Sequence, residues 1–466
     1  MSSSLSTHPA VQDPIPLFFF TYNCNQQDII PEVFKSKLLQ ILPDQLSSLY
    51  VFGFQEFCTV LEGLFPFSAN PKLIQLNQLL QSALHEKYQQ PTGFSTISST
   101  FVGAIGMIII TPFAAKFKNI RSATTSCGYA YSSLKGGVGA RISYFPEGAF
   151  DSTNFVELSF ATVHLNAFEG EYYYLQRNKN LYNIMRSLNF GDGYGLIKPK
   201  NHVFILGDMN YRTTQDYSTT SAESQELLSL IDGSILDASY FKKVETLVDK
   251  YDELKMSMRN GDVLQNFSEG RITFPPTYKF HVNTAIYNTK RSPSWCDRIV
   301  YLSSYEEVGK DNLGQQLLKL PHGGKSDNEE RVGNYLPVVK EYNSLESLLM
   351  SDHRPVYLEM TVPFNPPKSV ISSLSGCLQI LPAGLRSDIS FDGFSSLEAL
   401  ERSSNVVSGP TTIYLKPTTL DGITQTLIRP LSNSIIGYGL WLGSTRQGRI
   451  FSVVVVISFW VIFRFF

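Results

Sequence analysis

Five short polar blocks stand where apolar, strand-like runs of this chain begin or end. The most informative block, 207–212, follows the apolar run 203–206 and contains Asp208 and Asn210. A strand that ends in Asp-x-Asn presents a carboxylate and a carboxamide at one edge of a sheet, which suits a base or metal contact beside a phosphate hydrogen bond. The other four blocks contain Asn23, Glu56, His164 and the pair Asp352-His353. One shared active-site rim explains this recurrence.

Hydrolysis of a phosphate monoester is the chemistry that these residue types suit. It needs a metal to neutralise the anion, a base to activate water and hydrogen-bond donors around the phosphoryl oxygens. We expect Glu56, with Asn23 beside it, to bind Mg²⁺, because this cation prefers hard oxygen ligands. Asp208 is the predicted base, and Asn210 is a predicted donor to the phosphate.

Two of the seven histidines, His164 and His353, fall in such blocks and are predicted to donate to the phosphate. A histidine in this role needs a carboxylate behind it to orient the ring. Asp297 is the predicted partner of His353, and Asp352 is predicted to contribute to the metal site. Asp297 and the adjacent Arg298 alternatively form a local ion pair, which would be worth little if exposed.

Composition limits the function classes. The chain has 466 residues, of which 43% are hydrophobic, enough for one large domain with extensions. Its formal net charge of −2 provides no general basic field for nucleic acid, so local Lys and Arg must meet any anionic substrate. Five cysteines at irregular spacing form neither a disulfide framework nor a zinc motif, which indicates a reducing, cytosol-facing domain.

Strand-length apolar runs alternate with helix-like stretches and predict a sheet-rich α/β or α+β domain over residues 15–363. A disordered N-terminus, 1–14, precedes it. After residue 363 the composition shifts to Ser, Thr, Gly and Pro, with few apolar periodic segments. We therefore expect 364–434 to be a flexible linker.

The C-terminal segment, 435–466, is predicted to anchor the chain in a membrane. As a helix, 450–466 would be about 25 Å long, close to the ~27 Å core of a thin bilayer such as that of the endoplasmic reticulum. A buried strand is the alternative, since the run is β-branched. Trp460 near one end and Arg449 at the other favour the anchor. The run 435–442 is expected at the membrane interface.

Taken in order, the motifs resemble the inositol polyphosphate 5-phosphatase family over about residues 15 to 362. The resemblance implies the endonuclease/exonuclease/phosphatase fold, a four-layer α/β sandwich of two packed sheets flanked by helices, and dependence on Mg²⁺. The motifs are Thr21-Tyr22-Asn23, Phe54-Gln55-Glu56, Val163-His164-Leu165, Gly207 to Arg212, Phe274 to Lys279, Pro293 to Ile299 and Ser351 to Val356.

The resemblance implies the same roles for the catalytic residues. Glu56 and Asn23 would hold the metal, and Asp208 would activate water. The residues that would bind the scissile 5-phosphate are His164, Asn210 and His353.

The resemblance also implies a set of substrate contacts. Tyr278-Lys279 and Lys290-Arg291 resemble the part of the family that contacts the 4-phosphate of the inositol ring, and a vicinal bisphosphate demands such cations. Lys135, in a glycine-containing loop, and Arg298 complete the predicted substrate-binding residues. The chain departs from the family's usual residues at two positions, with Leu134 in place of Asn and Tyr22 in place of Trp.

The arrangement as a whole resembles members of this family that are tail-anchored in the endoplasmic reticulum. It implies a monomeric enzyme on that membrane, with its catalytic domain in the cytosol, that converts phosphatidylinositol 4,5-bisphosphate to phosphatidylinositol 4-phosphate. Confinement to a membrane raises the effective concentration of a lipid substrate. The alternatives are a nuclease of the same fold, a non-catalytic phosphoinositide-binding membrane scaffold and, less favoured, a sphingomyelin hydrolase.

Overall fold

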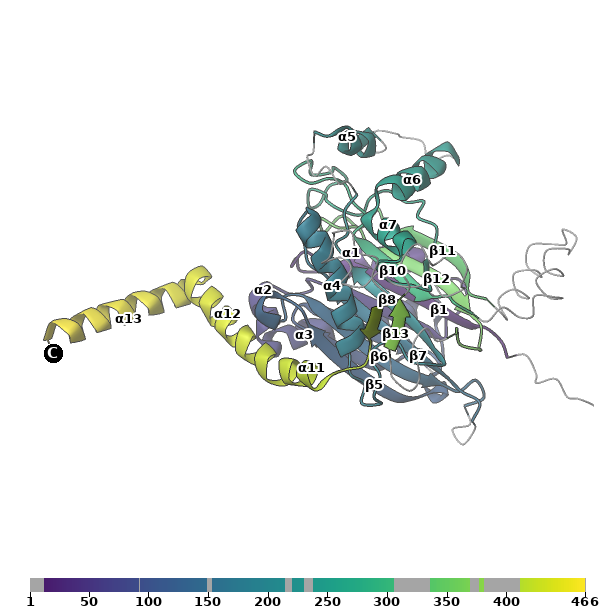
Figure 1. Ribbon diagram of the computed structural model, residues 1–466, viewed down its shortest axis with the longest axis horizontal. Helices are drawn as coiled ribbons and strands as arrows, with labels where there is room; N and C mark the ends of the chain where they lie inside the picture. Colours follow the sequence, from purple (N-terminus) through teal and green to yellow (C-terminus); the bar gives the residue numbers. More distant parts are fainter. Residues whose placement is uncertain are drawn as a thin grey trace, which may run out of the picture.

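Two six-stranded sheets form the centre of the computed structural model (Figure 1), which describes residues 12–91, 93–148, 153–213, 220–229, 238–305, 336–368, 377–380 and 411–465. The first sheet has the order β11 (Val338–Ser344), β12 (Val356–Val362), β1 (Ile15–Asn23), β2 (Leu49–Gln55), β4 (Ile105–Thr111), β3 (Ser95–Val102). The second has the order β5 (Phe117–Ser126), β6 (Gly136–Tyr144), β7 (Val156–His164), β8 (Asn201–Asp208), β10 (Asp297–Leu302), β9 (Phe267–Glu269).

The two sheets pack face to face through large apolar side chains. The ring of Phe19 on β1 lies 4.9 Å from that of Phe204 on β8, which in turn stacks on Phe160 of β7 at 5.3 Å between centroids. Both faces of the central strands are covered, so β1 and β8 carry continuous apolar runs, 15–20 and 203–206, instead of alternating.

Helices cover the outer faces of both sheets. On the first sheet, α1 (Pro31–Ile41) and α3 (Pro66–Tyr88) pack over residues such as Phe20 and Phe52. On the second sheet, α4 (Glu171–Ser187) and α7 (Glu253–Asn260) pack over Val203 and Ile205. Further α-helices in the described part of the domain are α2 (Val60–Leu64), α5 (Ala222–Ser229) and α6 (Ala238–Tyr251). The predicted four-layer sandwich is therefore confirmed.

Strand direction brings the polar blocks to one edge of the sandwich. In the parallel pair β1–β2, Asn23 stands opposite Gln55, the residue before Glu56. In the parallel pair β7–β8, His164 stands opposite Asp208. Because parallel strands end at the same edge of a sheet, these side chains meet without any long loop.

The described residues within the predicted linker, 364–434, form further strands and helices. A short strand, β13 (Cys377–Ile380), pairs with β14 (Thr411–Tyr414). The segment from Leu415 to residue 444 then packs along the domain as α11 (Thr419–Ile423), a π-helical turn (Thr424–Ile428) and α12 (Arg429–Ser444). Leu415 is fully buried in the core beneath α4.

Specific polar contacts hold this segment. The carboxylate of Asp421 accepts two hydrogen bonds from Arg186, at 3.1 and 2.8 Å, and Arg429 donates to Thr124 at 3.0 Å. The polar composition that predicted a tether therefore supplies hydrogen-bonding side chains to the domain surface. The predicted linker residues 369–376 and 381–410, and residues 1–11 of the predicted disordered N-terminus, lie outside the described residues.

The last helix, α13 (Arg446–Phe465), extends away from the domain at the yellow end of Figure 1. Its stretch 446–464 has a mean hydropathy of 1.5 and is only 6% buried, so it is long and apolar enough to cross a membrane. The segment is a helix and not the buried strand considered as an alternative.

Gly207 permits the close approach of β7 and β8 directly before Asp208. Its φ is +142°, and a Cβ at this position would lie 2.0 Å from the carbonyl oxygen of Val163. A side chain here would thus meet both an unfavourable backbone conformation and a backbone clash.

We expect Gly207→Ala to lower the free energy of unfolding by about 2–5 kcal/mol, because strain and overpacking add. The matched control is Gly193→Ala, where φ is +83° and an added Cβ would have no neighbour within 4 Å, so only about 1 kcal/mol should be lost. Urea unfolding of the purified proteins measures both. Equal losses for the two variants would contradict the proposed clash.

Candidate active site

The buried carboxylate of Asp208 lies at the centre of the site. One oxygen, Oδ2, accepts a hydrogen bond from the side-chain amide of Asn23 at 2.9 Å and lies 3.2 Å from Nε2 of His164. The other oxygen accepts the backbone N–H of Asn210 at 3.0 Å. Burial alone would raise the pKa of Asp208, but the His164 hydrogen bond and the nearby charges of His353 and Lys135 lower it. Asp208 is therefore held ionised.

His353 faces this carboxylate from the loop before β12. Its Nδ1 is 2.9 Å from Oδ2 of Asp297, and that same oxygen accepts a hydrogen bond from the hydroxyl of Thr277 at 2.7 Å. Its Nε2 is left pointing towards Asp208, 4.0 Å from Oδ2. Burial opposes a charge on the ring, yet Asp297 and Asp208 together raise the pKa of His353 to about 9. The predicted partnership of Asp297 with His353 is present, and the imidazolium is the dominant form at neutral pH.

Glu56 follows β2 and approaches the same cluster from the first sheet. It has a φ of +49°, in the left-handed region, and its Oε1 is 3.9 Å from Nε2 of His164. Asn23 lies beside it at the end of β1, with its amide oxygen accepting the N–H of Asn25. A φ of this sign is uncommon for a glutamate and is typical of residues at functional sites.

The side-chain oxygens of Glu56 and Asn23 are suitable ligands for a hard divalent cation. Carboxylate and amide oxygens are the ligands that Mg²⁺ and Ca²⁺ prefer. The side chain of Glu56 is 27% exposed and therefore open to an ion from solvent. Lys135 lies next to these groups, with its ammonium 2.5 Å from Nε2 of His164, and burial lowers its pKa. The predicted residues Glu56 and Asn23 thus fit the metal, and Lys135 lies among them.

Asp352 forms an ion pair with a lysine of the site. Its carboxylate lies 3.0 Å from the ammonium of Lys279, and the hydroxyl of the preceding Ser351 donates to the backbone carbonyl of Asn23 at 2.7 Å. Metal-compatible spacing among the described Asp, Glu, His and Cys residues occurs in the group Asp208, Asp297 and His353. A contribution of Asp352 to the metal site stays a prediction.

The predicted 4-phosphate residues lie beside His353. The ring of Tyr278 packs on that of His353 at 4.6 Å between centroids, and the ammonium of Lys279 lies 5.4 Å from the Tyr278 ring. Arg291 is half-buried and pairs with Glu169 at 3.2 Å, whereas Lys290 is exposed. Of this set, the structure brings Tyr278 and Lys279 directly to the site.

Arg298 is not available to a substrate. Its side chain is fully buried, with one nitrogen 2.8 Å from Asp252 and the other 2.5 Å from Glu269. The alternation of side chains along β10 explains the correction, because neighbours in a strand point to opposite faces and Asp297 already points into the site.

Arg212 also lies at the site, although no role was predicted for it from the sequence. Its guanidinium donates to the side-chain oxygen of Asn210 at 2.9 Å and lies 4.7 Å from the ring of Tyr278. Asn210 in turn donates to the carbonyl of Leu165 at 3.2 Å, so its amide is fixed at both ends. The position of Arg212 in the same block as Asp208 was the available signal.

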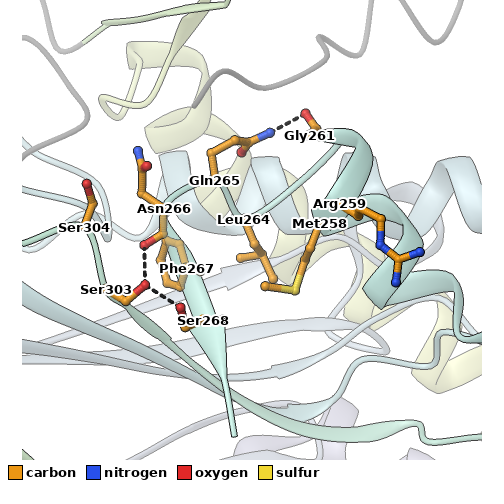
Figure 2. A pocket seen from close by; sticks show the side chains of 10 residues that line it. All are labelled: Met258, Arg259, Gly261, Leu264, Gln265, Asn266, Phe267, Ser268, Ser303 and Ser304. Atoms are coloured by element: carbon orange, nitrogen blue, oxygen red, sulfur yellow. Dashed lines mark hydrogen bonds between the residues drawn. The ribbon is translucent and has the colours of Figure 1, made fainter. Parts of the chain in front are cut away.

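A separate hollow of about 500 Å³ opens between the end of α7 and β9 (Figure 2). Figure 2 shows Ser303 linked by hydrogen bonds to Ser268 and to the backbone of Asn266. Its lining includes Arg259, which pairs with Asp249, but none of the carboxylates or imidazoles described above. The catalytic cluster lies elsewhere.

Comparison with known proteins identifies the domain type. The model of the family described as Endonuclease/Exonuclease/phosphatase family 2 matches residues 20–359. Among curated proteins, rat Synaptojanin-2 is 26% identical over 317 residues, covering 66% of this chain and 19% of the relative. Inositol-1,4,5-trisphosphate 5-phosphatase 1 of Schizosaccharomyces pombe is 31% identical over 265 residues, covering 55% and 22% respectively. The aligned region thus spans about a fifth of each of these relatives.

A solved structure shows the same fold. The inositol polyphosphate 5-phosphatase domain of SPsynaptojanin, in complex with inositol (1,4)-bisphosphate and calcium ion, superposes with a TM-score of 0.53. It is 26% identical to this chain, and the match covers 75% of this chain and 84% of that domain. The resemblance drawn from the motifs is confirmed.

The raised pKa of His353 predicts a pH dependence. Since an ordinary histidine titrates near 6.5, the ion pair with Asp297 should stabilise the fold fully below about pH 6.5 and lose this effect as pH rises through about 9. In metal-chelated protein, NMR titration of the His353 ring should show a midpoint near 9. Asp297→Asn should lower it by about one unit or more.

The control for this titration is Asp249→Asn, since Asp249 pairs with Arg259 at the surface. It should leave the His353 midpoint unchanged. An unchanged midpoint in Asp297→Asn would show that another group sets the charge of His353.

Proposed function

Since this chain belongs to the Endonuclease/Exonuclease/phosphatase family 2, with inositol polyphosphate 5-phosphatases among its relatives, we propose that it removes the 5-phosphate of phosphatidylinositol 4,5-bisphosphate to give phosphatidylinositol 4-phosphate in a Mg²⁺-dependent reaction at a membrane surface. The observation that carries the proposal is the ionised Asp208, bonded to Asn23 and His164 and faced by the Nε2 of His353.

The roles of the residues follow from charge and geometry. The imidazolium of His353 and the side chains of His164 and Asn210 suit the phosphoryl oxygens, because charge-assisted donors are the strongest partners of an anion. Asp208, ionised and acceptor-only, suits the attacking water, whose proton it takes. A divalent cation at Glu56 and Asn23 would neutralise phosphate charge and make bound water more acidic. Asp297, itself held by the hydroxyl of Thr277, keeps the Nδ1 of His353 occupied, which directs Nε2 to the phosphate.

The 4-phosphate is assigned to Lys279. Its ammonium is about one-third exposed and lies beside Tyr278. A bound phosphate can replace its ion pair with the single carboxylate of Asp352 at little cost in free energy, because one charge-assisted contact is exchanged for another. The half-buried Arg291 lies close enough to affect the pKa of Lys279, and the exposed Lys290 precedes Arg291 in the chain. For this reason we propose phosphatidylinositol 4,5-bisphosphate, PI(4,5)P₂, as the substrate in preference to phosphatidylinositol 5-phosphate.

The proposed membrane attachment rests on α13. This helix has the length and apolarity of a membrane span, which supports a tail anchor with the catalytic domain in the cytosol. The endoplasmic reticulum and a monomeric state are part of the same proposal. A nuclease is disfavoured by the net charge of −2, and a non-catalytic scaffold by the presence of the whole cluster around Asp208.

The test of this proposal is phosphate release from a panel of short-chain phosphoinositides, with and without Mg²⁺. Release from the 4,5-bisphosphate, lost after chelation, is expected. Asp208→Asn should lower kcat by ~10²–10⁴-fold while leaving lipid binding intact, because the amide keeps the shape and loses the proton acceptor.

The control variant is Glu245→Gln, which alters a carboxylate paired with the exposed Arg271. It should change neither kcat nor lipid binding. Asp208→Asn with more than a tenth of the wild-type rate would remove Asp208 from the water-activating role. Cleavage of an abasic-site oligonucleotide in place of phosphoinositide would favour the nuclease.

Lys279 provides a specificity prediction. Lys279→Ala should lower kcat/KM on PI(4,5)P₂ by about tenfold or more while changing the value for phosphatidylinositol 5-phosphate much less, because only the former leaves a phosphate unpaired. The comparison of the two substrates controls for folding. Equal losses would show that Lys279 serves the scissile phosphate or the structure of the site.

A further inference from the structure

A pocket of about 410 Å³ opens directly beside the phosphoryl site. Glu56, Lys135 and His164 line one end of it. The remainder is lined largely by apolar side chains, and two of them, Ile436 and Leu440, come from α12, outside the catalytic domain. The inner face of the C-terminal helix therefore closes a space that begins at the proposed metal residues.

The position of α12 against the domain is specific. The side-chain oxygen of Asn433 accepts the N–H of Ser133 at 2.8 Å, and its amide nitrogen donates to the Ser133 hydroxyl at 2.8 Å. Ser432 donates to the carbonyl of Ala130 at 2.6 Å. Both contacts fall on the loop that leads to Lys135, so α12 braces the segment that carries this lysine into the site.

A close apolar contact fixes the middle of α12. A Cβ added at Gly437 would lie 2.9 Å from the ring of Phe65, so only glycine allows the helix to approach this closely. The ring of Tyr438 packs edge-on against the same phenylalanine, at 5.5 Å between centroids. The helix cannot move outward without losing these contacts. They therefore keep Ile436 in the lining of the pocket.

The opposite face of the segment is also apolar. Leu427, Leu431 and Ile435 recur every four residues and are 67%, 62% and 65% exposed. A helix with apolar residues on an open face, continuous with a helix long enough to span a membrane, is suited to the bilayer surface. Such a position would put the pocket between the bilayer and the phosphoryl site.

We propose that α12 is a wall of the substrate site and that the pocket closed by Ile436 and Leu440 receives the hydrocarbon part of a lipid whose phosphorylated headgroup reaches Glu56 and His164. The inference rests on the proposed function and extends it, because it assigns recognition of the lipid chains to the C-terminal segment. An apolar pocket at the phosphate end of the site offers nothing to a soluble inositol phosphate, whereas burial of each CH₂ group favours a lipid.

The test compares two substrates with the same headgroup, dibutanoyl and dioctanoyl PI(4,5)P₂, on the detergent-solubilised full chain. Wild-type protein should prefer the longer chains in kcat/KM. Leu440→Gln should lower the dioctanoyl to dibutanoyl ratio by roughly tenfold, since apolar contact is lost, while lowering the dibutanoyl value much less than the dioctanoyl value. Leu440→Trp, which fills the pocket, should reduce the ratio similarly and provides a second variant if the glutamine disturbs folding.

The matched control is Ile435→Gln, on the outer face of the same helix, which should keep the wild-type ratio. A wild-type ratio in both Leu440 variants would overturn the inference, as would equal losses on the two substrates, which would make α12 a purely structural brace. Failure of the wild-type protein to release phosphate from either lipid would instead overturn the proposed function.

Discussion

The burial of one charged carboxylate, that of Asp208, is the constraint on which the rest of the site depends. A buried ion is tolerated only when it is paired and hydrogen-bonded. Asp208 obtains its partners from both sheets: Asn23 from the first, and His164 and the Asn210 backbone from the second. The two sheets must therefore keep their relative position for the carboxylate to stay ionised.

Residues behind the site fix the orientation of the side chains that surround Asp208. His353 is held by Asp297, and Asp297 by Thr277, so the ring has a defined direction. Arg212 fixes the amide of Asn210 in the same way. These residues place donors before a substrate arrives, which is how an active site stabilises developing charge without reorganising itself.

The docked C-terminal segment changes how the membrane and the active site relate to each other. A flexible tether would leave the domain free to rotate above a bilayer, with only its local concentration raised. The contacts of Asp421 with α4, of Arg429 with β5 and of Asn433 with the loop before Lys135 hold the segment against the domain instead. In the proposed function, the orientation of the active-site mouth towards the lipid then becomes a property of the fold.

The sequence was a good guide wherever function depends on residues at strand ends. Alternating strand and helix patterns predicted a sheet-rich α/β or α+β domain, and the family resemblance implied the sandwich. Asn23, Glu56, His164 and Asp208 were proposed because each lies at or directly after the end of an apolar strand. It was a poor guide to Arg298, which directly follows Asp297 in the chain. Neighbouring side chains of a strand point to opposite faces, and only the packing shows that Arg298 is buried against Asp252 and Glu269.

By itself, then, the sequence determined the fold class, the set of polar residues proposed for catalysis and the apolar run at the C-terminus, because these follow from local periodicity and from residue type. Only the tertiary structure decided which charges pair, that Lys135 lies among the proposed metal residues, and that α12 docks beside the site. Ser133 and Asn433 are three hundred residues apart in the chain. Their contact depends on the shape of two surfaces, which no local pattern of residues encodes.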